Sequence, residues 1–299
     1  MIEQLKEQFG KNLIIKEKLS KYNWFNLGGP ADIFFRPENK DQLIEFLNKI
    51  KTINLKTYFL GAGSNTLIRD SGIKGAVIKL GSKFSQIKLI AQNEVEVGAA
   101  ALDRNVSNFA KENNIGDMEF LSCIPGSIGG AITMNSGCYG SEISEILSSV
   151  KVLDPQGKEK EFKRNEINFF YRGCSLPKEY LILSAKLKGT KSSKERIGII
   201  QEELINRKKL SQPSRIKTGG STFKNHKQKK AWELIKDSGC DKFFIGDAKI
   251  SEKHCNFFIN NGNAKTSDLE KLINKVKKEV YKKTGINLEL EIKIIGDEK

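Results

Sequence analysis

The stretch Ile124–Gly140 constrains the fold of this chain more than any other segment, because its seventeen residues include five glycines. It begins Ile-Pro-Gly-Ser-Ile-Gly-Gly, and its five glycines all lie near small or polar residues. An ordinary packed core would not use so many glycines, since each one costs backbone entropy on folding. A backbone that lies against a large flat ligand would use them. The stretch therefore predicts a ligand-binding surface made largely of main chain.

A second glycine turn, Leu60–Asn65, reads Leu-Gly-Ala-Gly-Ser-Asn and follows the apolar pair Tyr58-Phe59. Successive exposed N–H groups in such a turn, together with serine and asparagine side chains, can bind a pyrophosphate. The turn differs from the dinucleotide fingerprint G-x-G-x-x-G, which opens a helix, because here a strand resumes after Gly75. A simple tight turn between two strands is the alternative interpretation.

The coarse pattern of the chain mixes strands and helices and predicts an α+β protein. The length of 299 residues suffices for two or three domains. Predicted helices cover residues 41–50, 191–207, with Ser192 and Glu195 as a capping box, and 267–284, with Ser267 and Glu270 as another and Gly285 as the stop. Predicted strands cover residues 76–80, 94–98, 150–153, which begins a hairpin through Asp154–Gly157, and 288–295.

Charge and cysteine content exclude several classes of protein. The net charge is +15, but lysine is spread along the whole chain, which favours a solvated basic surface over a nucleic-acid site. Five cysteines without a C-x-x-C pair, and only two histidines, indicate neither a disulfide framework nor a metal site. The beginning of the chain lacks the apolar region of a signal peptide, and no window predicts a membrane helix. We therefore expect a cytoplasmic protein without membrane insertion.

Four segments, taken together and in order, resemble one enzyme family. They are Asn26–Asp32, Leu60–Asn65, Ile124–Gly130 and Met134-Asn135. Their order and spacing are similar to the flavin-contacting segments of the UDP-N-acetylenolpyruvoylglucosamine reductase family. The resemblance covers roughly residues 20–296. It implies FAD as the bound cofactor, held by Asn26, Gly28, Gly29, Gly61, Ala62, Gly63, Ser64, Asn65, Thr66, Ile124, Pro125, Gly126, Ser127, Gly129, Gly130, Ala131 and Asn135.

The last third of the chain extends the resemblance to the substrate site. Tyr171-Arg172 is similar to the family's Tyr-Arg pair, whose arginine acts at the substrate carboxylate. Gly220–Asn225 resembles the family's Gly-Ser-x-Phe-Lys-Asn motif, whose serine donates a proton. The resemblance therefore implies Arg172 and Ser221 as catalytic residues. It implies substrate binding by Tyr171, Lys224, Asn225, His254 and Asn256, the last two from a Ser-x-x-His-x-Asn segment.

The terminal strand resembles the family's strand that carries a catalytic glutamate, and it offers two candidates. Glu289 and Glu291 lie on the same face of a strand, because side chains alternate, so geometry alone leaves both open. The family pattern places its acid before a β-branched residue, a base and an apolar-Gly ending, which favours Glu291.

The fold that the resemblance implies is an FAD-binding fold of the vanillyl-alcohol oxidase type, with two α+β subdomains, plus a C-terminal α+β substrate domain. We expect an N-terminal subdomain at 1–75, to which 288–299 return, a second FAD-binding subdomain at 76–205, and the substrate domain at 206–287. His226 replaces a proline that commonly follows Phe-Lys-Asn in the family. The short connection after Arg172 resembles the family's shorter subclass, which lacks a substrate-covering loop.

The function implied is NADPH-dependent reduction of UDP-N-acetylglucosamine enolpyruvate to UDP-N-acetylmuramate, with NADPH and substrate sharing one site. The alternatives are a related FAD-dependent oxidase acting on another small substrate, and a basic nucleic-acid-binding protein. His254 is open between a structural and a substrate-binding role.

Overall fold

The computed structural model describes residues 2–298, and the chain divides into two compact units. Unit 1 contains the residues up to Ile14, Phe34–Ala62 and Ala76–Lys208. Unit 2 contains Ile15–Ile33, Gly63–Gly75 and the residues from Lys209 on. The three predicted domains divide the chain differently, since residues 1–75 belong partly to each unit, and their limits stay a prediction. Among the described residues, no helix is both long and apolar enough to cross a membrane.

The first sheet has the strand order β1-β2-β5-β3. Its strands are β1 (Leu13–Lys18), β2 (Pro30–Phe35), β5 (Ile73–Ile78) and β3 (Thr57–Phe59), and the helices of this part are α1 (Ile2–Phe9) and α2 (Lys40–Thr52). The division between the units falls within β1, β2 and β5. The helix predicted at 41–50 is confirmed as α2, whose start is capped by the side chain of Asn39. Its apolar face is buried, and the rings of Phe35 and Phe46 stack 3.9 Å apart.

A five-stranded antiparallel sheet forms the centre of unit 1, in the order β11-β10-β14-β7-β6. The strands are β6 (Ile87–Ala91), β7 (Glu94–Gly98), β10 (Leu147–Leu153), β11 (Glu159–Lys163) and β14 (Leu181–Lys188). The predicted hairpin is confirmed, because β10 pairs with β11. In β7 the alternating residues Val95 and Val97 are fully buried, as expected for a strand with one face in the core.

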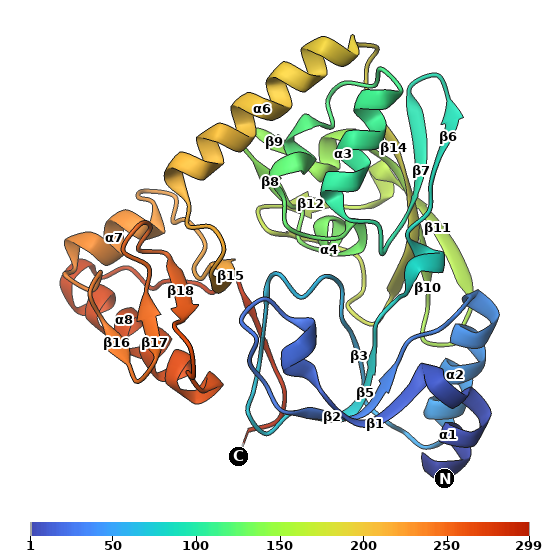
Figure 1. The fold of residues 1–299 in the computed structure, drawn as a ribbon, viewed down its shortest axis with the longest axis horizontal. Helices are drawn as coiled ribbons and strands as arrows, with labels where there is room; N and C mark the ends of the chain where they lie inside the picture. Colours follow the sequence, from blue (N-terminus) through green and yellow to red (C-terminus); the bar gives the residue numbers. More distant parts are fainter. Residues whose placement is uncertain (1, 299) are drawn as a thin grey trace. The chain divides into compact units, whose positions relative to one another are not determined.

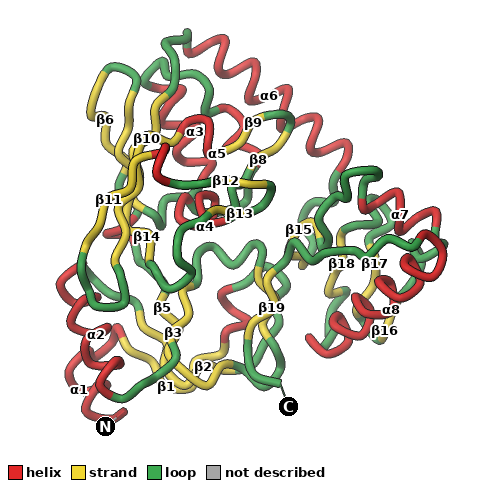
Figure 2. The backbone as a smooth tube through the Cα atoms, turned by 180° about the vertical axis from the view of Figure 1, so that it is seen from behind, coloured by secondary structure: helices red, strands yellow, loops and turns green. Residues whose placement is uncertain are grey.

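Several short elements and the longer helix α6 accompany this sheet. They are α3 (Asp103–Glu112), α4 (Ile128–Thr133), β8 (Gly137–Cys138), β9 (Ser141–Glu142), α5 (Ile143–Ile146), β12 (Phe169–Phe170), β13 (Gly173–Cys174) and α6 (Lys194–Ser211). Figure 2 shows α4 beside β13 and β14. The glycine-rich stretch thus forms the turn before α4, the helix itself, and the β8–β9 hairpin.

Unit 2 contains a second antiparallel sheet, of order β15-β18-β17-β16, and a parallel pair, β19-β4. The strands are β4 (Thr66–Ile68), β15 (Lys217–Ser221), β16 (Phe244–Ile245), β17 (Ala248–Ile250), β18 (Phe257–Asn260) and β19 (Lys293–Ile295), and the helices are α7 (Ala231–Asp237) and α8 (Thr266–Thr284). Figure 1 shows α8 against this antiparallel sheet, with α7 beside α8. Phe223 and Phe258 are fully buried in the hydrophobic core that this sheet shares with α7 and α8.

Three predicted boundaries were wrong in detail. α6 begins at Lys194, and Ser193 rather than Ser192 caps it, since the Ser193 hydroxyl accepts from the Arg196 N–H at 3.2 Å. α8 begins one residue early because a distant carboxylate caps it: Asp70 accepts from the N–H groups of Thr266 and Ser267. The terminal strand is only Lys293–Ile295, because the residues before it form an isolated bridge, Phe223 to Leu290, instead of a continuous ladder.

Candidate active site

The glycine turn Leu60–Asn65 is shaped by contacts with the protein's own backbone. Gly63 has φ +71°, and a Cβ atom there would lie 2.1 Å from the Tyr22 carbonyl oxygen. Glycine is therefore required at this position whether or not a ligand is bound. Sequence reasoning attributed such glycines to ligand approach, whereas here the close approach is between two segments of unit 2. Gly63, Ser64, Asn65 and Thr66 lie in unit 2, and Gly61 and Ala62 lie in unit 1.

Lys79, which sequence reasoning missed, lies beside the first part of this turn. It follows β5, and its ammonium group donates a hydrogen bond to the Gly61 carbonyl. Burial, and then the nearby charge of Arg36, lower the pKa of Lys79 to about 8. The parallel pairing of β3 with β5 places the residue after β5 next to the turn after β3. Only this strand pairing identifies Lys79 as a neighbour of the turn, because the sequence alone does not distinguish it from the many other lysines.

The second glycine segment leads into α4, and its first helical N–H groups already have acceptors. The N–H of Ile128 donates to the Ala101 carbonyl at 3.0 Å, and that of Gly129 donates to the Ala99 carbonyl at 2.9 Å. Asn135, at the end of the segment, is 1% exposed, and its amide donates to the Glu142 carboxylate at 2.7 Å. These bonds fix the shape of the segment. The assignment of its residues to FAD stays a prediction.

Asp103 is a buried acid behind this segment that sequence reasoning also missed. The first residue of α3, it is fully buried, and among residues 2–298 neither carboxylate oxygen has a hydrogen-bond partner. A Cβ atom on Gly126 would lie 2.6 Å from its Oδ2, so the acid packs directly against the turn. Burial raises the pKa of Asp103 well above its usual range.

We expect Asp103→Asn to stabilise the protein increasingly as pH rises. Above about pH 4 an unfolded aspartate loses its proton while buried Asp103 keeps it, so the wild-type free energy of unfolding falls with rising pH until the folded pKa is reached. The asparagine side chain does not titrate, so the variant lacks this fall in the free energy of unfolding, which amounts to about 1.4 kcal/mol per pH unit. Urea unfolding of both proteins at several pH values measures the difference. Asp41→Asn, at an exposed position in α2, is the control, and a difference between Asp103→Asn and wild type that stays constant with pH would contradict the assignment.

Arg172 lies at the tip between β12 and β13. Its φ is +59°, an uncommon left-handed conformation for an arginine. The Nη2 atom donates to the Gly137 carbonyl at 3.3 Å, and the guanidinium lies 4.9 Å from the centre of the Tyr171 ring. The ring of Tyr171 is exposed. In the predicted Tyr-Arg pair, the guanidinium of Arg172 therefore packs over the ring of Tyr171, next to the β8–β9 hairpin.

Ser221, Glu291 and Asn65 come from three distant parts of the sequence and meet in unit 2. The Glu291 N–H donates to the carbonyl of Thr222, the residue after Ser221, at 2.9 Å. The carbonyl of Glu291 accepts from the Asn65 side chain at 3.0 Å. The pairing register of β15 shifts between Thr218 and Ser221, and such an irregularity re-aims a side chain. The structure thus brings a predicted cofactor residue, the predicted acid and the predicted proton donor to adjacent segments.

The two candidate glutamates differ in their surroundings. Glu289 has a side chain that is 76% exposed, and its Oε2 lies 3.5 Å from Nζ of Lys224. Glu291 is half-buried, and its backbone is held on both sides by the bonds to Thr222 and Asn65. An exposed ion pair such as that of Glu289 contributes little stability. These surroundings support the choice of Glu291.

Asn256 is almost fully buried, and its side chain supports the strand that carries Ser221. Its Oδ1 accepts from the Phe223 N–H at 2.9 Å, and its Nδ2 donates to the Phe223 carbonyl at 2.7 Å. Such a pair of bonds favours a positioning role. Asn225, in contrast, is exposed, and its Oδ1 accepts from the first N–H of α7 at 3.0 Å. Their assignment to substrate binding stays a prediction.

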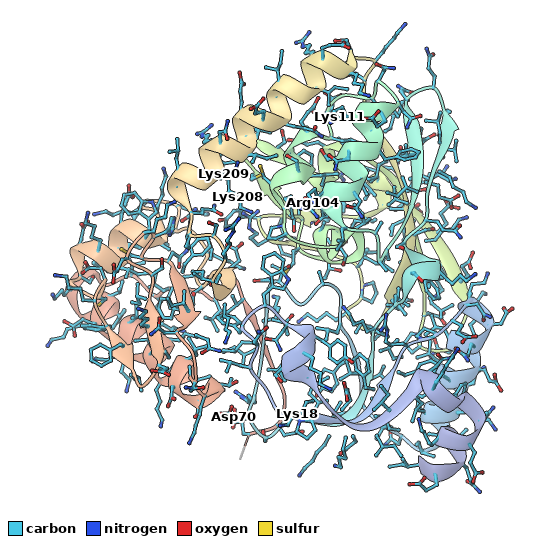
Figure 3. All side chains as sticks on the ribbon, in the orientation of Figure 1. Lys18, Asp70, Arg104, Lys111, Lys208 and Lys209 are labelled. Atoms are coloured by element: carbon cyan, nitrogen blue, oxygen red, sulfur yellow. The ribbon has the colours of Figure 1, made fainter. Side chains whose placement is uncertain are left out.

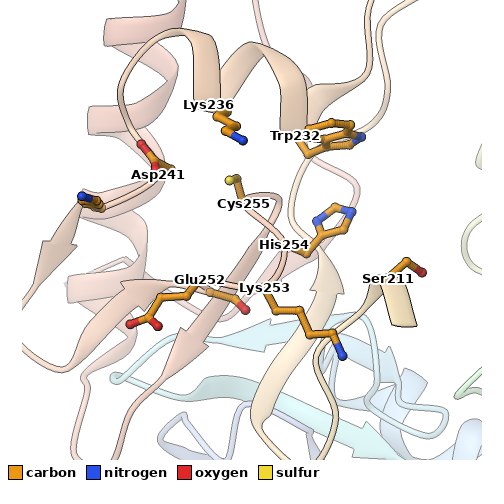
Figure 4. A pocket seen from close by; sticks show the side chains of 10 residues that line it. Ser211, Trp232, Lys236, Asp241, Glu252, Lys253, His254 and Cys255 are labelled. Atoms are coloured by element: carbon orange, nitrogen blue, oxygen red, sulfur yellow. The ribbon is translucent and has the colours of Figure 1, made fainter. Parts of the chain in front are cut away.

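His254 lines a cavity of about 500 Å³ within unit 2. Burial lowers the pKa of His254, and the neutral ring accepts a hydrogen bond at Nδ1 from the Asn256 N–H. Figure 4 shows its ring near the indole of Trp232, with Lys253 on the same side of the cavity. The volume is within the range of small-molecule sites, and the lining combines aromatic, basic and acidic side chains.

Ser221, Glu291 and His254 lie in unit 2, whereas Tyr171 and Arg172 lie in unit 1. The joining of Arg172 with Ser221 and Glu291 at one substrate therefore stays a prediction.

The fold and these turns define a class of protein, the FAD-binding α+β proteins, since residues 31–163 match the family model described as FAD binding domain. Residues 212–295 match the model of the UDP-N-acetylenolpyruvoylglucosamine reductase C-terminal domain. A reductase of that name from Pelagibacter ubique is 45% identical over 98% of both chains, and one from Rickettsia akari is 44% identical over 93% of this chain and 94% of its own.

The solved structure of UDP-N-acetylenolpyruvylglucosamine reductase from Thermus caldophilus is also similar, with a TM-score of 0.82 and 30% identity over 94% of this chain and 97% of that one. The chain belongs to the UDP-N-acetylenolpyruvoylglucosamine reductase family. The resemblance drawn from the sequence is confirmed, and with it the expectation of an FAD-binding α+β fold with a C-terminal domain. Membership of this family does not favour the two alternative functions, those of an FAD-dependent oxidase and of a nucleic-acid-binding protein.

Proposed function

We propose that this chain reduces UDP-N-acetylglucosamine enolpyruvate to UDP-N-acetylmuramate with NADPH, through bound FAD, in the synthesis of peptidoglycan precursors. Family membership supports the reaction. The observation that carries the assignment of residues is the meeting of Ser221, Glu291 and Asn65 on adjacent segments of unit 2.

The residues around the glycine turns fit a dinucleotide. Ser64 and Asn65 offer hydrogen-bond donors, and the ammonium group of Lys79 lies beside Gly61. A positive charge and backbone N–H groups at a glycine turn suit a pyrophosphate. The segments 26–29, 61–66 and 124–135 would hold the cofactor. The chemistry that FAD would supply there is the transfer of a hydride from NADPH to the β-carbon of the enolpyruvyl group.

The protein's own residues supply the rest of the reaction. Addition at the β-carbon places negative charge on the α-carbon and the adjoining carboxylate. The guanidinium of Arg172 and the protonated carboxyl of Glu291 would stabilise this charge as it forms, which is what lowers the barrier. The Ser221 hydroxyl would then give its proton to the α-carbon. Tyr171, Lys224 and Asn225 would orient the substrate.

The cavity beside His254 is the part of unit 2 that we assign to the nucleotide portion of the ligands. Lys236, Lys242 and Lys253 among its lining residues favour an anion, and the Trp232 ring offers an apolar face. NADPH and the sugar nucleotide are both anionic and both carry a pyrophosphate. We infer that they use one site in turn. Five free cysteines are compatible with a reducing compartment, which supports the cytoplasm as the location.

The function is tested with the purified protein and its two proposed substrates. We expect a flavin absorbance spectrum, oxidation of NADPH that depends on UDP-N-acetylglucosamine enolpyruvate, and inhibition by that substrate at high concentration. Inhibition follows because the substrate would occupy the site that NADPH needs. Turnover with oxygen alone at a comparable rate would contradict the reductase assignment. A ternary complex of enzyme, NADPH and substrate, found in binding experiments, would contradict the shared site alone.

A further inference from the structure

Two cysteine thiols of unit 1 lie at the two ends of the glycine-rich loop. Cys123 ends the 3-10 helix Glu119–Cys123, and Cys138 lies in β8. β8 packs against this 3-10 helix, with the Cys138 Sγ 3.5 Å from the Phe120 carbonyl oxygen, and each of the two thiols shifts the pKa of the other. Cys123 is 5% exposed, and Cys138 is half-buried. The two sulfurs therefore belong to one cluster, which reaches water through Cys138.

A half-buried lysine completes this cluster. Nζ of Lys208, in α6, donates to the Cys123 carbonyl at 2.8 Å, and its charge acts on both thiols. A hydrogen bond from Cys138 has the largest effect on the Cys123 thiol and lowers its pKa below the usual range. A hydrogen bond with Ser122 and the charge of Lys208 also lower this pKa, whereas burial opposes the shift. Burial raises the pKa of the Cys174, Cys240 and Cys255 thiols. Cys123 is thus the thiol best able to react as a thiolate.

We propose that Cys123 and Cys138 form a reversible dithiol–disulfide pair that is oxidised by hydrogen peroxide. The Cys123 thiolate attacks one peroxide oxygen, so an S–O bond forms, the O–O bond breaks, and the leaving hydroxide takes up a proton to become water. The Cys138 sulfur then attacks the Cys123 sulfur, loses its proton and displaces a second water as the S–S bond forms. Two electrons pass from the sulfurs to the peroxide, and a dithiol reverses the step.

The disulfide would close the loop that contains Ile124–Gly137, which carries the predicted FAD residues between Ile124 and Asn135. It would also fix Cys138, the neighbour of Gly137, whose carbonyl accepts from Arg172. Oxidation of the pair is therefore coupled to the position of the proposed catalytic cation. The thiol chemistry itself does not depend on the proposed function, whereas any effect on turnover does.

The test counts thiols in the full-length protein after treatment with hydrogen peroxide, unfolding and alkylation. We expect the wild type to lose two of its five alkylatable thiols, with recovery after dithiothreitol. Cys123→Ser and Cys138→Ser should each abolish this paired loss, whereas Cys174→Ser, at another half-buried cysteine of unit 1, should retain it. Peptide mapping of the oxidised wild type should show a cross-link between the peptides of Cys123 and Cys138, which keeps the test valid if a variant fails to fold.

Two neighbouring lysines of α6 provide a second, matched test. Figure 3 marks Lys208 and Lys209, and only Lys208 interacts with the thiol cluster. Lys208→Gln should slow the peroxide-dependent loss of thiols several-fold, and Lys209→Gln should leave its rate unchanged. Five alkylatable thiols in the peroxide-treated wild type, or a cross-link that involves any other cysteine, would overturn the proposal.

Discussion

Replacing Ser221 with alanine is expected to slow the half-reaction with the enolpyruvyl substrate by at least ~100-fold, the low end for the loss of a general acid. The half-reaction with NADPH should stay nearly unchanged, because no proton from Ser221 is needed there. Ser221 follows the register shift in β15 and precedes the residue that accepts from the Glu291 N–H, so the position is fixed by backbone bonds that the substitution leaves in place. Stopped-flow absorbance of the flavin measures the two half-reactions separately.

The controls for this variant separate proton donation from support of the fold. Ser221→Cys should recover part of the lost rate, since a thiol can also give up a proton. Ser214→Ala, at an exposed position before β15, should behave as wild type in both half-reactions. If Ser221→Ala slowed the reaction with NADPH as much as the reaction with the substrate, the serine would be a structural or cofactor contact, and its assignment as the acid would be wrong.

Glu291→Gln is expected to reduce turnover on the order of 100- to 1,000-fold, the usual effect of removing one group that stabilises developing charge. Glu289→Gln should change turnover by no more than about fivefold, because it removes only an exposed ion pair with Lys224. The glutamine at position 291 preserves the backbone bonds to Thr222 and Asn65, so the structure should be retained. Steady-state kinetics of the two purified variants provides the comparison.

Thermal unfolding of both glutamate variants serves as the control for this pair. Equal midpoints with wild type would show that any loss in rate arises from chemistry rather than from misfolding. A large loss in Glu289→Gln together with near-normal turnover in Glu291→Gln would reverse the assignment between the two residues. Similar losses in both would mean that the ion pair with Lys224 takes part in the same step.

Local patterns in the sequence predicted those elements whose stabilisation is local. The helix in residues 40–52 has its apolar residues at helical spacing, and Gly285 at the end of α8 adopts the left-handed conformation typical of a helix stop. The hairpin of β10 and β11 follows from a proline-containing turn between two alternating strands. In each case the residues that determine the structure are neighbours in the chain.

Contacts between distant segments could not be read from the sequence. Asp70 caps α8 from almost two hundred residues away, so the predicted capping box of Ser267 and Glu270 was wrong, and Glu270 instead bonds to Arg69. The strand predicted at 288–295 is shorter because its first half lies beside residues 222–224. Asp103 and Lys79 were missed for the same reason, since burial against a glycine turn depends on the tertiary fold.

For the candidate site, the motifs identified the family and predicted the residues, and the structure showed the contacts that hold those residues in place. The sequence could not distinguish a glycine that meets a ligand from one that meets another part of the backbone, as Gly63 does at Tyr22. Nor could it show that the Asn256 amide is used by Phe223. Side-chain chemistry can be inferred from a motif, but the partner of each polar group requires the fold.

The discontinuity of unit 2 has a consequence for the order of events during synthesis on the ribosome. Its strand β4 emerges early, but the partner strand β19 and the helix capped by Asp70 are translated only after Ala76–Lys208 of unit 1. The contacts of unit 1 can therefore form while the chain is still growing, and β4 can pair with β19 only after Lys293–Ile295 has been translated. Pairings of such long sequence separation are slow to form, because the entropy of closing the intervening loop is lost before the contact stabilises the chain. The hydrogen bond from the Asn65 side chain to the Glu291 carbonyl can thus form only after all of Ala76–Lys208 has been translated.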